Sequence, residues 1–192
     1  MTVLVGYASA HGSTEGIARE VGDRLRKGGV DTSVRPLLEV AAVSQYRAFV
    51  LGSAVHNQGW LPEAQAFFER FGTELVGRPV WLFSVCSVGD TTSFFGPHLS
   101  ELIRRSRHDD PVLAGAVELL QPRGHRHFAG GLQRGDWGRL GELFLKVCGG
   151  TTGDHRDWVD VDGWADEIAR SLQLDNRKQE RRRLHLMVRG KP

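Results

Sequence analysis

The chain of 192 residues contains only two cysteines, Cys86 and Cys148, and no hydrophobic run approaches the roughly 20 residues that cross a bilayer. Two cysteines cannot supply a disulfide framework or a thiolate metal cluster. The first residues also lack the cationic stretch and apolar core of a signal peptide. We therefore expect a cytoplasmic protein whose cysteines are free thiols, with no metal site.

The net charge is small, but the charged residues are unevenly placed. The formal net charge is +2, yet residues 177–192 carry seven Lys and Arg against one acid, Glu180, so this stretch is +6 and the rest −4. We divide the chain into a domain over 1–175 and a basic C-terminal tail over 176–192. The tail could bind anionic lipid at the inner face of a membrane, bind nucleic acid or an acidic protein, or end in solvent as a disordered segment. It lacks interleaved aromatic residues, so no nucleic-acid partner is expected.

Strand-like and helix-like patterns alternate along the chain. Short apolar or β-branched runs predict five strands, at residues 2–6, 32–36, 48–51, 80–85 and 126–132. Helical periodicity fills the intervals, including a stretch over 98–121 that breaks near Pro111. Two further amphipathic segments follow, one with Trp137, Leu140, Phe144 and Val147, the other with Val161, Trp164, Ala165, Ile168 and Leu172. This order predicts an α/β three-layer sandwich around a five-stranded parallel sheet, with strand order 2-1-3-4-5.

The topology directs attention to one edge of the predicted sheet. In strand order 2-1-3-4-5 the direction of winding reverses between strands one and three, and ligands bind beyond the carboxyl ends of the strands there. The loops 9–14 and 53–60 follow those two strands. We expect both loops to contribute to one site.

The first loop, Ser9-Ala10-His11-Gly12-Ser13-Thr14, contains glycine and hydroxyl residues but no lysine or arginine. Gly12 lets the backbone turn tightly, and the amides of the following helix carry the positive end of its dipole. Such a loop suits one phosphate group held by neutral donors, and it lacks the lysine of a nucleoside-triphosphate loop. It suggests a flavin mononucleotide (FMN) site. The alternative is a helix whose first turn is capped by Ser or Thr.

Residues of the next two loops are candidates for contacts to a flavin ring. Trp60 could stack on the ring, or it could be a core tryptophan that docks the next helix. Cys86 has no basic neighbour in sequence that would lower its pKa, so we interpret it as a packing thiol. The remaining candidates in these two loops are Ser53, Ala54, Val55, His56, Asn57, Ser84, Val85, Ser87, Val88 and Gly89.

The residues of the first loop and of several later stretches match a known protein family. The chain resembles flavodoxins, because Ser9-x-His-Gly-Ser-Thr14 is similar to their Thr-x-Thr-Gly-Asn-Thr element. Over residues 2–172 it is more closely similar to flavodoxin-like proteins of the menaquinone-dependent protoporphyrinogen dehydrogenase type. The matching stretches are Val50-Leu-Gly-Ser-Ala-Val-His, Phe83-Ser-Val, Phe128-Ala-Gly-Gly-Leu, Gly149-Gly-Thr-Thr-Gly-Asp, Asp157-Trp and Trp164-Ala-Asp-Glu-Ile-Ala. The resemblance implies the flavodoxin-like fold and a bound FMN, with phosphate contacts from residues 9–14 and ring contacts from 53–60 and 84–89.

The sequence also departs from the family pattern. His11 and Ser13 replace the commoner residues of the loop, which keeps donors in place but changes the charge near the phosphate. The segment 89–121 carries Phe94-Phe95 and a cluster of arginines, unlike the segment that covers the flavin in porphyrinogen-oxidising relatives.

Three functions follow from these expectations. The first is an FMN-dependent oxidoreductase acting on a small molecule such as a quinone or a porphyrinogen, for which we name no acid–base residue. The second is a one-electron carrier that serves a redox partner. The third is a scaffold that uses the fold without flavin.

Overall fold

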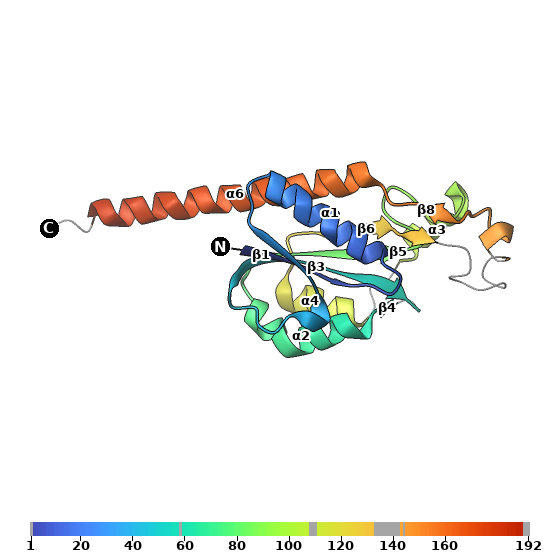
Figure 1. Ribbon diagram of the computed structural model, residues 1–192, viewed down its shortest axis with the longest axis horizontal. Helices are drawn as coiled ribbons and strands as arrows, with labels where there is room; N and C mark the ends of the chain where they lie inside the picture. The colour runs from blue at the N-terminus through green and yellow to red at the C-terminus, as the bar shows by residue number, and fades with distance from the viewer. Residues whose placement is uncertain (1, 58, 108–110, 133–142, 144, 190–192) are drawn as a thin grey trace.

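Five parallel strands form the centre of the computed structural model, which describes residues 2–57, 59–107, 111–132, 143 and 145–189 (Figure 1). The strands lie in the order β2-β1-β3-β5-β6. Their bounds are β1 Thr2–Ala8, β2 Thr32–Pro36, β3 Tyr46–His56, β5 Val80–Cys86 and β6 His125–Ala129. A short strand, β4 (Gly59–Trp60), pairs antiparallel with the end of β3. Because β5 and β6 are the fourth and fifth predicted strands, the predicted order 2-1-3-4-5 is confirmed.

The burial of each strand follows its sequence. β1 and β3 are apolar runs with both faces covered, and Val5 of β1 is in register with Val50 of β3. β2 is polar, only partly buried and ends in Pro36, which suits an edge strand. Side chains of β1 alternate between two cores, so Val3 and Val5 face one helical layer and Leu4 faces the other.

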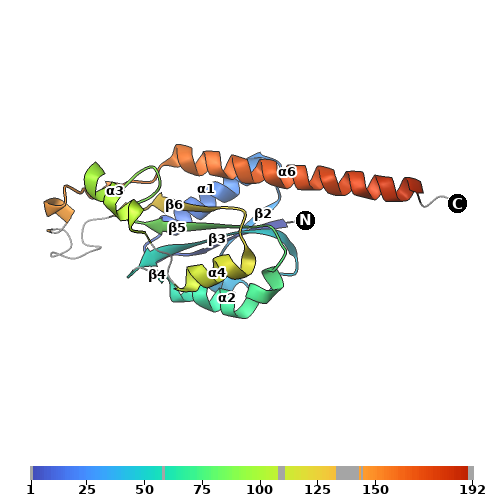
Figure 2. The same ribbon diagram turned by 180° about the vertical axis from the view of Figure 1, so that it is seen from behind.

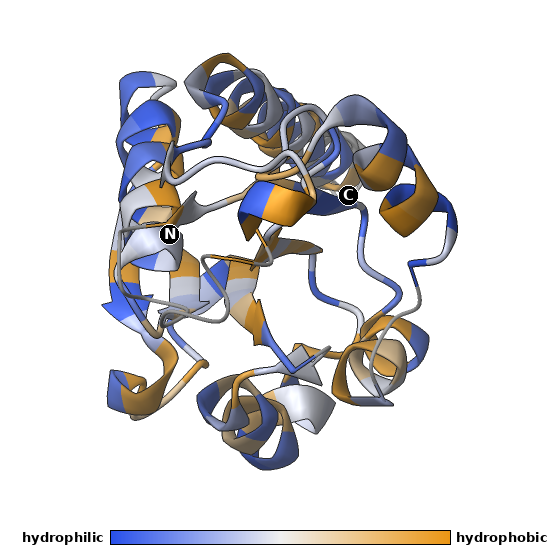
Figure 3. Cartoon of the chain, turned by 90° about the vertical axis from the view of Figure 1, so that its right-hand side faces the viewer, coloured by the Kyte–Doolittle hydropathy of each residue, from blue (hydrophilic) through white to orange (hydrophobic). Residues whose placement is uncertain are grey.

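Two helical layers cover the sheet (Figure 1, Figure 2). On one face lie α1 (Ser13–Lys27) and α6 (Trp158–Arg189), where Ile17 and Val21 of α1 share a core with Trp164 of α6. On the other face lie α2 (Pro62–Leu75) and α4 (Pro111–Leu120). Figure 3 looks at the carboxyl edge of the sheet and shows hydrophobic and hydrophilic residues alternating along the helices that surround it. This is the expected three-layer sandwich.

The smaller elements mostly match the sequence patterns. The helical stretch over 98–121 divides into α3 (Pro97–Arg105) and α4, as the break near Pro111 predicts. The strand predicted over 126–132 divides into β6 and β7 (Gly131–Leu132), and β7 pairs with β8 (Gly153–Asp154). A 3-10 turn, η1 (Leu37–Glu39), follows β2. Of the amphipathic segment near 137–147, Trp137, Leu140 and Phe144 lie outside the described residues, and Val147 is exposed.

The last helix is longer than its apolar pattern predicts. Val161, Ala165, Ile168 and Leu172 form its buried face, but α6 continues to Arg189. Residues 177–189 are therefore helical, and the alternative of a disordered tail is wrong for them. None of the helices in the described part of the chain combines the length and apolar composition required to cross a membrane.

Candidate functional site

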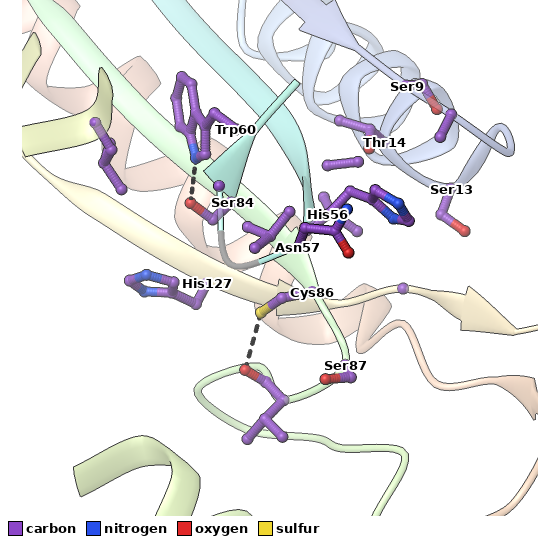
Figure 4. A pocket seen from close by; sticks show the side chains of 18 of the residues that line it. Ser9, Ser13, Thr14, His56, Asn57, Trp60, Ser84, Cys86, Ser87 and His127 are labelled. Atoms are coloured by element: carbon purple, nitrogen blue, oxygen red, sulfur yellow. Dashed lines mark hydrogen bonds between the residues drawn. The ribbon is translucent and has the colours of Figure 1, made fainter. Parts of the chain in front are cut away.

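A cavity of about 1270 Å³ opens at the carboxyl edge of the sheet, where the loops after β1, β3 and β5 meet (Figure 4). It lies at the predicted place. Of the 18 residues predicted to bind the cofactor, 15 line it: Ser9, Ala10, His11, Ser13, Thr14, Ala54, Val55, His56, Asn57, Trp60, Ser84, Val85, Cys86, Ser87 and Val88. The other three, Gly12, Ser53 and Gly89, are not among its lining residues and act on the shape of the loops.

Gly12 sets the geometry of the first loop. It is the N-cap of α1 and adopts a left-handed conformation with φ 85°. Its amide donates to the hydroxyl oxygen of Ser9 at 3.0 Å, and the first helical hydrogen bond runs from Gly16 N to Gly12 O at 2.9 Å. No side chain caps the helix. The alternative of an ordinary Ser- or Thr-capped helix is therefore wrong, and the amides of the first turn lack an intrahelical partner beside the cavity.

Ser13 and Thr14 differ although they are adjacent in sequence. The Ser13 hydroxyl donates to the carbonyl of Gly131 at 3.2 Å and accepts from the Gly131 amide at 2.9 Å, so it ties α1 to β7. Thr14 is 1 % exposed, and its Oγ1 has no hydrogen-bond partner among the described residues. A buried hydroxyl without a partner costs free energy, about 1–3 kcal/mol. Thr14 is therefore the residue of this loop whose hydroxyl is left without a partner by the protein itself.

A buried serine, Ser53, fixes the conformation of the loop after β3. Ser53 is fully buried, accepts the Leu61 amide at 3.0 Å and donates to the Ala54 carbonyl at 2.8 Å. This closes a hairpin with Asn57 at its turn, where φ is 49°. His56, which is exposed, and Asn57 line the cavity between the first loop and Ser84 in the view of Figure 4.

Trp60 belongs to both the core and the cavity wall. Its indole stacks on Phe68 of α2, with ring centroids 5.8 Å apart, and its side chain is 6 % exposed. Its Nε1 donates to Ser84 Oγ at 2.8 Å (Figure 4), and Ser84 Oγ lies 2.9 Å from His125 Nε2. This packing favours the alternative of a tryptophan that docks the next helix, with little of the indole left to stack on a ring.

The loop after β5 is tied down by protein groups. The Cys86 thiol donates to the Val88 carbonyl at 3.0 Å, and burial raises the pKa of the thiol. Arg104 of α3 donates to the carbonyl of Gly89 at 2.8 Å, and Arg107 donates to that of Val88. The structure thus agrees with Cys86 as a packing thiol rather than a nucleophile.

Gly89 allows this loop to touch the neighbouring strand. A Cβ at this position would lie 2.4 Å from the Ala129 amide nitrogen and 2.8 Å from the Phe128 carbonyl carbon. Because both are backbone atoms, no side chain can move to make room. Gly89 is therefore required by close packing on β6.

His127 of β6 is a cavity residue that sequence reasoning missed. Asp90 accepts the His127 amide at 2.9 Å and the Arg107 guanidinium at 3.0 Å. Burial, with the nearby His125 and Arg107, lowers the pKa of His127 to about 4, so its ring is neutral at neutral pH. Burial opposes ionisation of Asp90, but the His127 amide and Arg107 outweigh it and keep the pKa of Asp90 below its usual value.

Helices α3 and α4 and their flanks supply a second set of lining residues that were not predicted as site residues. Ile103 belongs to α3 and Arg107 follows it, while Val112 and Leu113 belong to the first turn of α4. For His127 a usable signal was present, because strand pairing places it opposite Ser84 at the same edge of the sheet. Within the described residues, no group of three or more His, Cys, Asp or Glu side chains is placed to hold a metal ion.

Comparison with known proteins bears directly on this architecture. The family described as "Flavodoxin domain" matches residues 4–133. No curated protein sequence matches the chain significantly. Several solved structures share the fold at low sequence identity. A Pseudomonas aeruginosa flavodoxin carrying one cysteine-to-serine substitution is 16% identical, with a TM-score of 0.56, over 90% of this chain and 99% of that one. The Streptococcus pneumoniae TIGR4 flavodoxin is 17% identical, with a TM-score of 0.54, over 89% and 99%.

A larger protein has the same fold in part of its length. The rubredoxin oxygen:oxidoreductase of Desulfovibrio gigas is 17% identical, with a TM-score of 0.59, over 90% of this chain. This chain spans only 36% of that protein. At such identities the structural matches show the fold alone, whereas the family match covers well over half of the sequence. The chain belongs to the flavodoxin-domain family.

Proposed function

We propose that the protein is an FMN-dependent oxidoreductase whose phosphate site is the loop 9–14. The observation that carries this proposal is the Thr14 hydroxyl, buried and without a partner beside an uncapped helix start. A phosphate monoester placed there would accept from the Thr14 hydroxyl and from the free amides of the first turn. Because the donors are uncharged, they suit one phosphate rather than a triphosphate.

The residues of the cavity fit the rest of the cofactor. Residues 54–57 and 84–88 line the space beyond the phosphate loop, where a ring could lie. Apolar side chains such as Val55 and Val88 line the same space, as expected for a flat heterocycle. FMN bound here would supply two-electron redox chemistry, while the protein fixes its position and exposure.

The lining of the cavity supports an enzyme with its own substrate. Beyond the loops 9–14, 54–57 and 84–88, the cavity is lined by residues of α3 and α4 and by His127, whose neutral ring can hydrogen-bond a carbonyl oxygen. A quinone has this combination of apolar body and carbonyl groups. The finer hypothesis is therefore the quinone-dependent protoporphyrinogen dehydrogenase type, in which each cycle moves two electrons and two protons from the porphyrinogen to the quinone.

A one-electron carrier is the second candidate. The two flavodoxins described above match this chain over 99% of their own length, so the domain is of the size of a flavodoxin. The two candidates differ in what the flavin does during reduction. A carrier accumulates a stable one-electron form and turns over no small molecule, whereas an oxidoreductase turns over its substrate.

The test begins with purified protein. We expect it to be yellow, or to become so with FMN, and the released cofactor to be identified as FMN by mass spectrometry. Photoreduction of the holoprotein, and reoxidation of the reduced protein by 2-methyl-1,4-naphthoquinone monitored by rapid mixing, then separate enzyme from carrier. An enzyme returns to oxidised flavin in one two-electron step, whereas a carrier passes through a stable one-electron form. A colourless protein that does not titrate with FMN would contradict the proposal and would favour a scaffold.

A further inference from the structure

Helix α6 leaves the body of the protein at a defined point. Gln173 Nε2 donates to the Gly28 carbonyl at 3.0 Å, Arg123 pairs with Asp175, and Arg47 donates to Asn176 Oδ1. The described side chains from 177 onward are exposed. The helix continues to Arg189, a length of about 20 Å at 1.5 Å per residue. Figure 1 shows this part of α6 projecting away from the sheet, at the end opposite β4 and α3.

Basic residues at the start of this projection share one face of the helix. Leu174 and the residues three, four, seven and eight positions after it lie on one side of an α-helix. At 3.6 residues per turn these five positions fall within an arc of about 140° around the helix axis. We call these residues the basic stripe: Leu174, Arg177, Lys178, Arg181 and Arg182. Glu180, the one acid after Asn176, falls outside the arc.

We propose that the basic stripe docks the protein on an anionic lipid surface. A helix face that carries four cations suits a plane of anionic headgroups, and the body of the molecule, with its net charge of −4, is repelled by the same plane. The stripe therefore fixes which end of the molecule approaches the lipid. Leu174, which belongs to the stripe, is 54 % exposed. Such a side chain can enter the headgroup boundary and would gain nothing on a nucleic-acid duplex.

A lipid surface also explains why a helix can extend this far from the body. An isolated helix of this length is marginal in water, and contact with a surface would stabilise it. Docking through the stripe leaves the cavity free, because the cavity opens at the opposite end of the sheet (Figure 1). The proposal is independent of the cofactor and holds for the apoprotein as well.

The experiment is co-sedimentation of the full chain with vesicles of equimolar phosphatidylcholine and phosphatidylglycerol, and with phosphatidylcholine alone. The test variant is R177Q/K178Q/R181Q/R182Q. The matched control is R19Q/R26Q/K27Q/R105Q, which removes the same charge from exposed positions of the body. Circular dichroism verifies that both variants keep their helix content.

We expect the wild-type protein to bind the anionic vesicles in low salt, to release in high salt, and not to bind phosphatidylcholine alone. The test variant should lose partitioning by on the order of 100-fold or more, and the control should retain it. No binding by the wild type, equal binding by the test variant, or an equal loss in the control would each overturn the proposal. Binding to a short DNA duplex in place of the vesicles would overturn it as well.

Discussion

The loops after β1 and β5 border the same cavity but are stabilised in opposite ways. The loop 9–14 leaves Thr14 without a partner and leaves the start of α1 uncapped. In the loop 86–90, Arg104, Arg107 and His127 bond to the backbone or to Asp90. The first loop therefore leaves hydrogen-bonding groups without partners, whereas the second is held by other parts of the protein. Substitution of Thr14 in the first loop should change FMN binding, and substitutions in the second loop should change stability.

The largest effect is expected at Gly89. In Gly89→Ala the new Cβ would meet the backbone of Ala129 and Phe128, so the loop must leave β6. We expect a loss of about 3 kcal/mol in the free energy of unfolding, measured by urea denaturation. Gly115→Ala is the matched control, since nothing lies within 4 Å of its added Cβ and α4 should gain about 0.5–1 kcal/mol. Equal stabilities for the two variants would refute the close-packing role of Gly89.

Thr14→Val tests the first loop because it should leave the apoprotein as stable or more stable and should weaken FMN binding. The substitution removes a buried hydroxyl without a partner and keeps the shape, so the apoprotein should be unchanged or more stable by up to about 1 kcal/mol. FMN binding should weaken by about 10- to 100-fold, because a hydrogen bond to a charged group is lost. Fluorescence titration and apoprotein denaturation measure both effects. A less stable apoprotein with normal FMN affinity would show that Thr14 is structural.

His127, next to the loop 86–90, should make the stability of the protein depend on pH. In the unfolded chain its pKa is near 6.5, whereas burial lowers it to about 4 in the folded protein. The unfolded state thus binds the extra proton first, and stability contributed by neutral His127 is lost as pH falls from 6.5 to 4. We expect on the order of 1–2 kcal/mol, reduced from the full shift by partial exposure. Denaturation between pH 7.5 and 4.5 measures it, and His127→Gln should flatten that part of the profile.

Ser13→Ala has the smallest expected effect. Its hydroxyl bonds to both polar groups of the Gly131 backbone, so its loss should cost about 1 kcal/mol of stability. FMN affinity should change less than in Thr14→Val. A larger loss of FMN affinity in Ser13→Ala would reverse the roles assigned to these two hydroxyls.

Much of this architecture could be predicted from the sequence. Apolar runs such as Val3-Leu-Val and Ala48-Phe-Val-Leu give the buried strands, and the right-handed crossover rule leaves one natural order. The glycine and hydroxyls of residues 9–14 place the first loop at the correct edge. Because local residue types determine these features, a single sequence is enough to predict them.

The rest depends on contacts between distant segments. Ser13 and Thr14 are both hydroxyl residues, and only the position of Gly131 shows that one of them is already satisfied. Trp60 is packed by Phe68 and Ser84, which no local pattern indicates. His127 lies in the cavity because β6 pairs with β5 and places it opposite Ser84, whereas the residue types next to it in the sequence do not indicate a site. These residues require tertiary structure.

The most direct measurement compares FMN and riboflavin binding by the wild-type apoprotein. The two flavins share the ring and the ribityl chain, and FMN alone carries the phosphate. If the Thr14 hydroxyl and the free amides of α1 bind a phosphate monoester, FMN should bind tighter by on the order of 100-fold or more. Equal affinities for the two flavins would contradict a phosphate site in the loop 9–14.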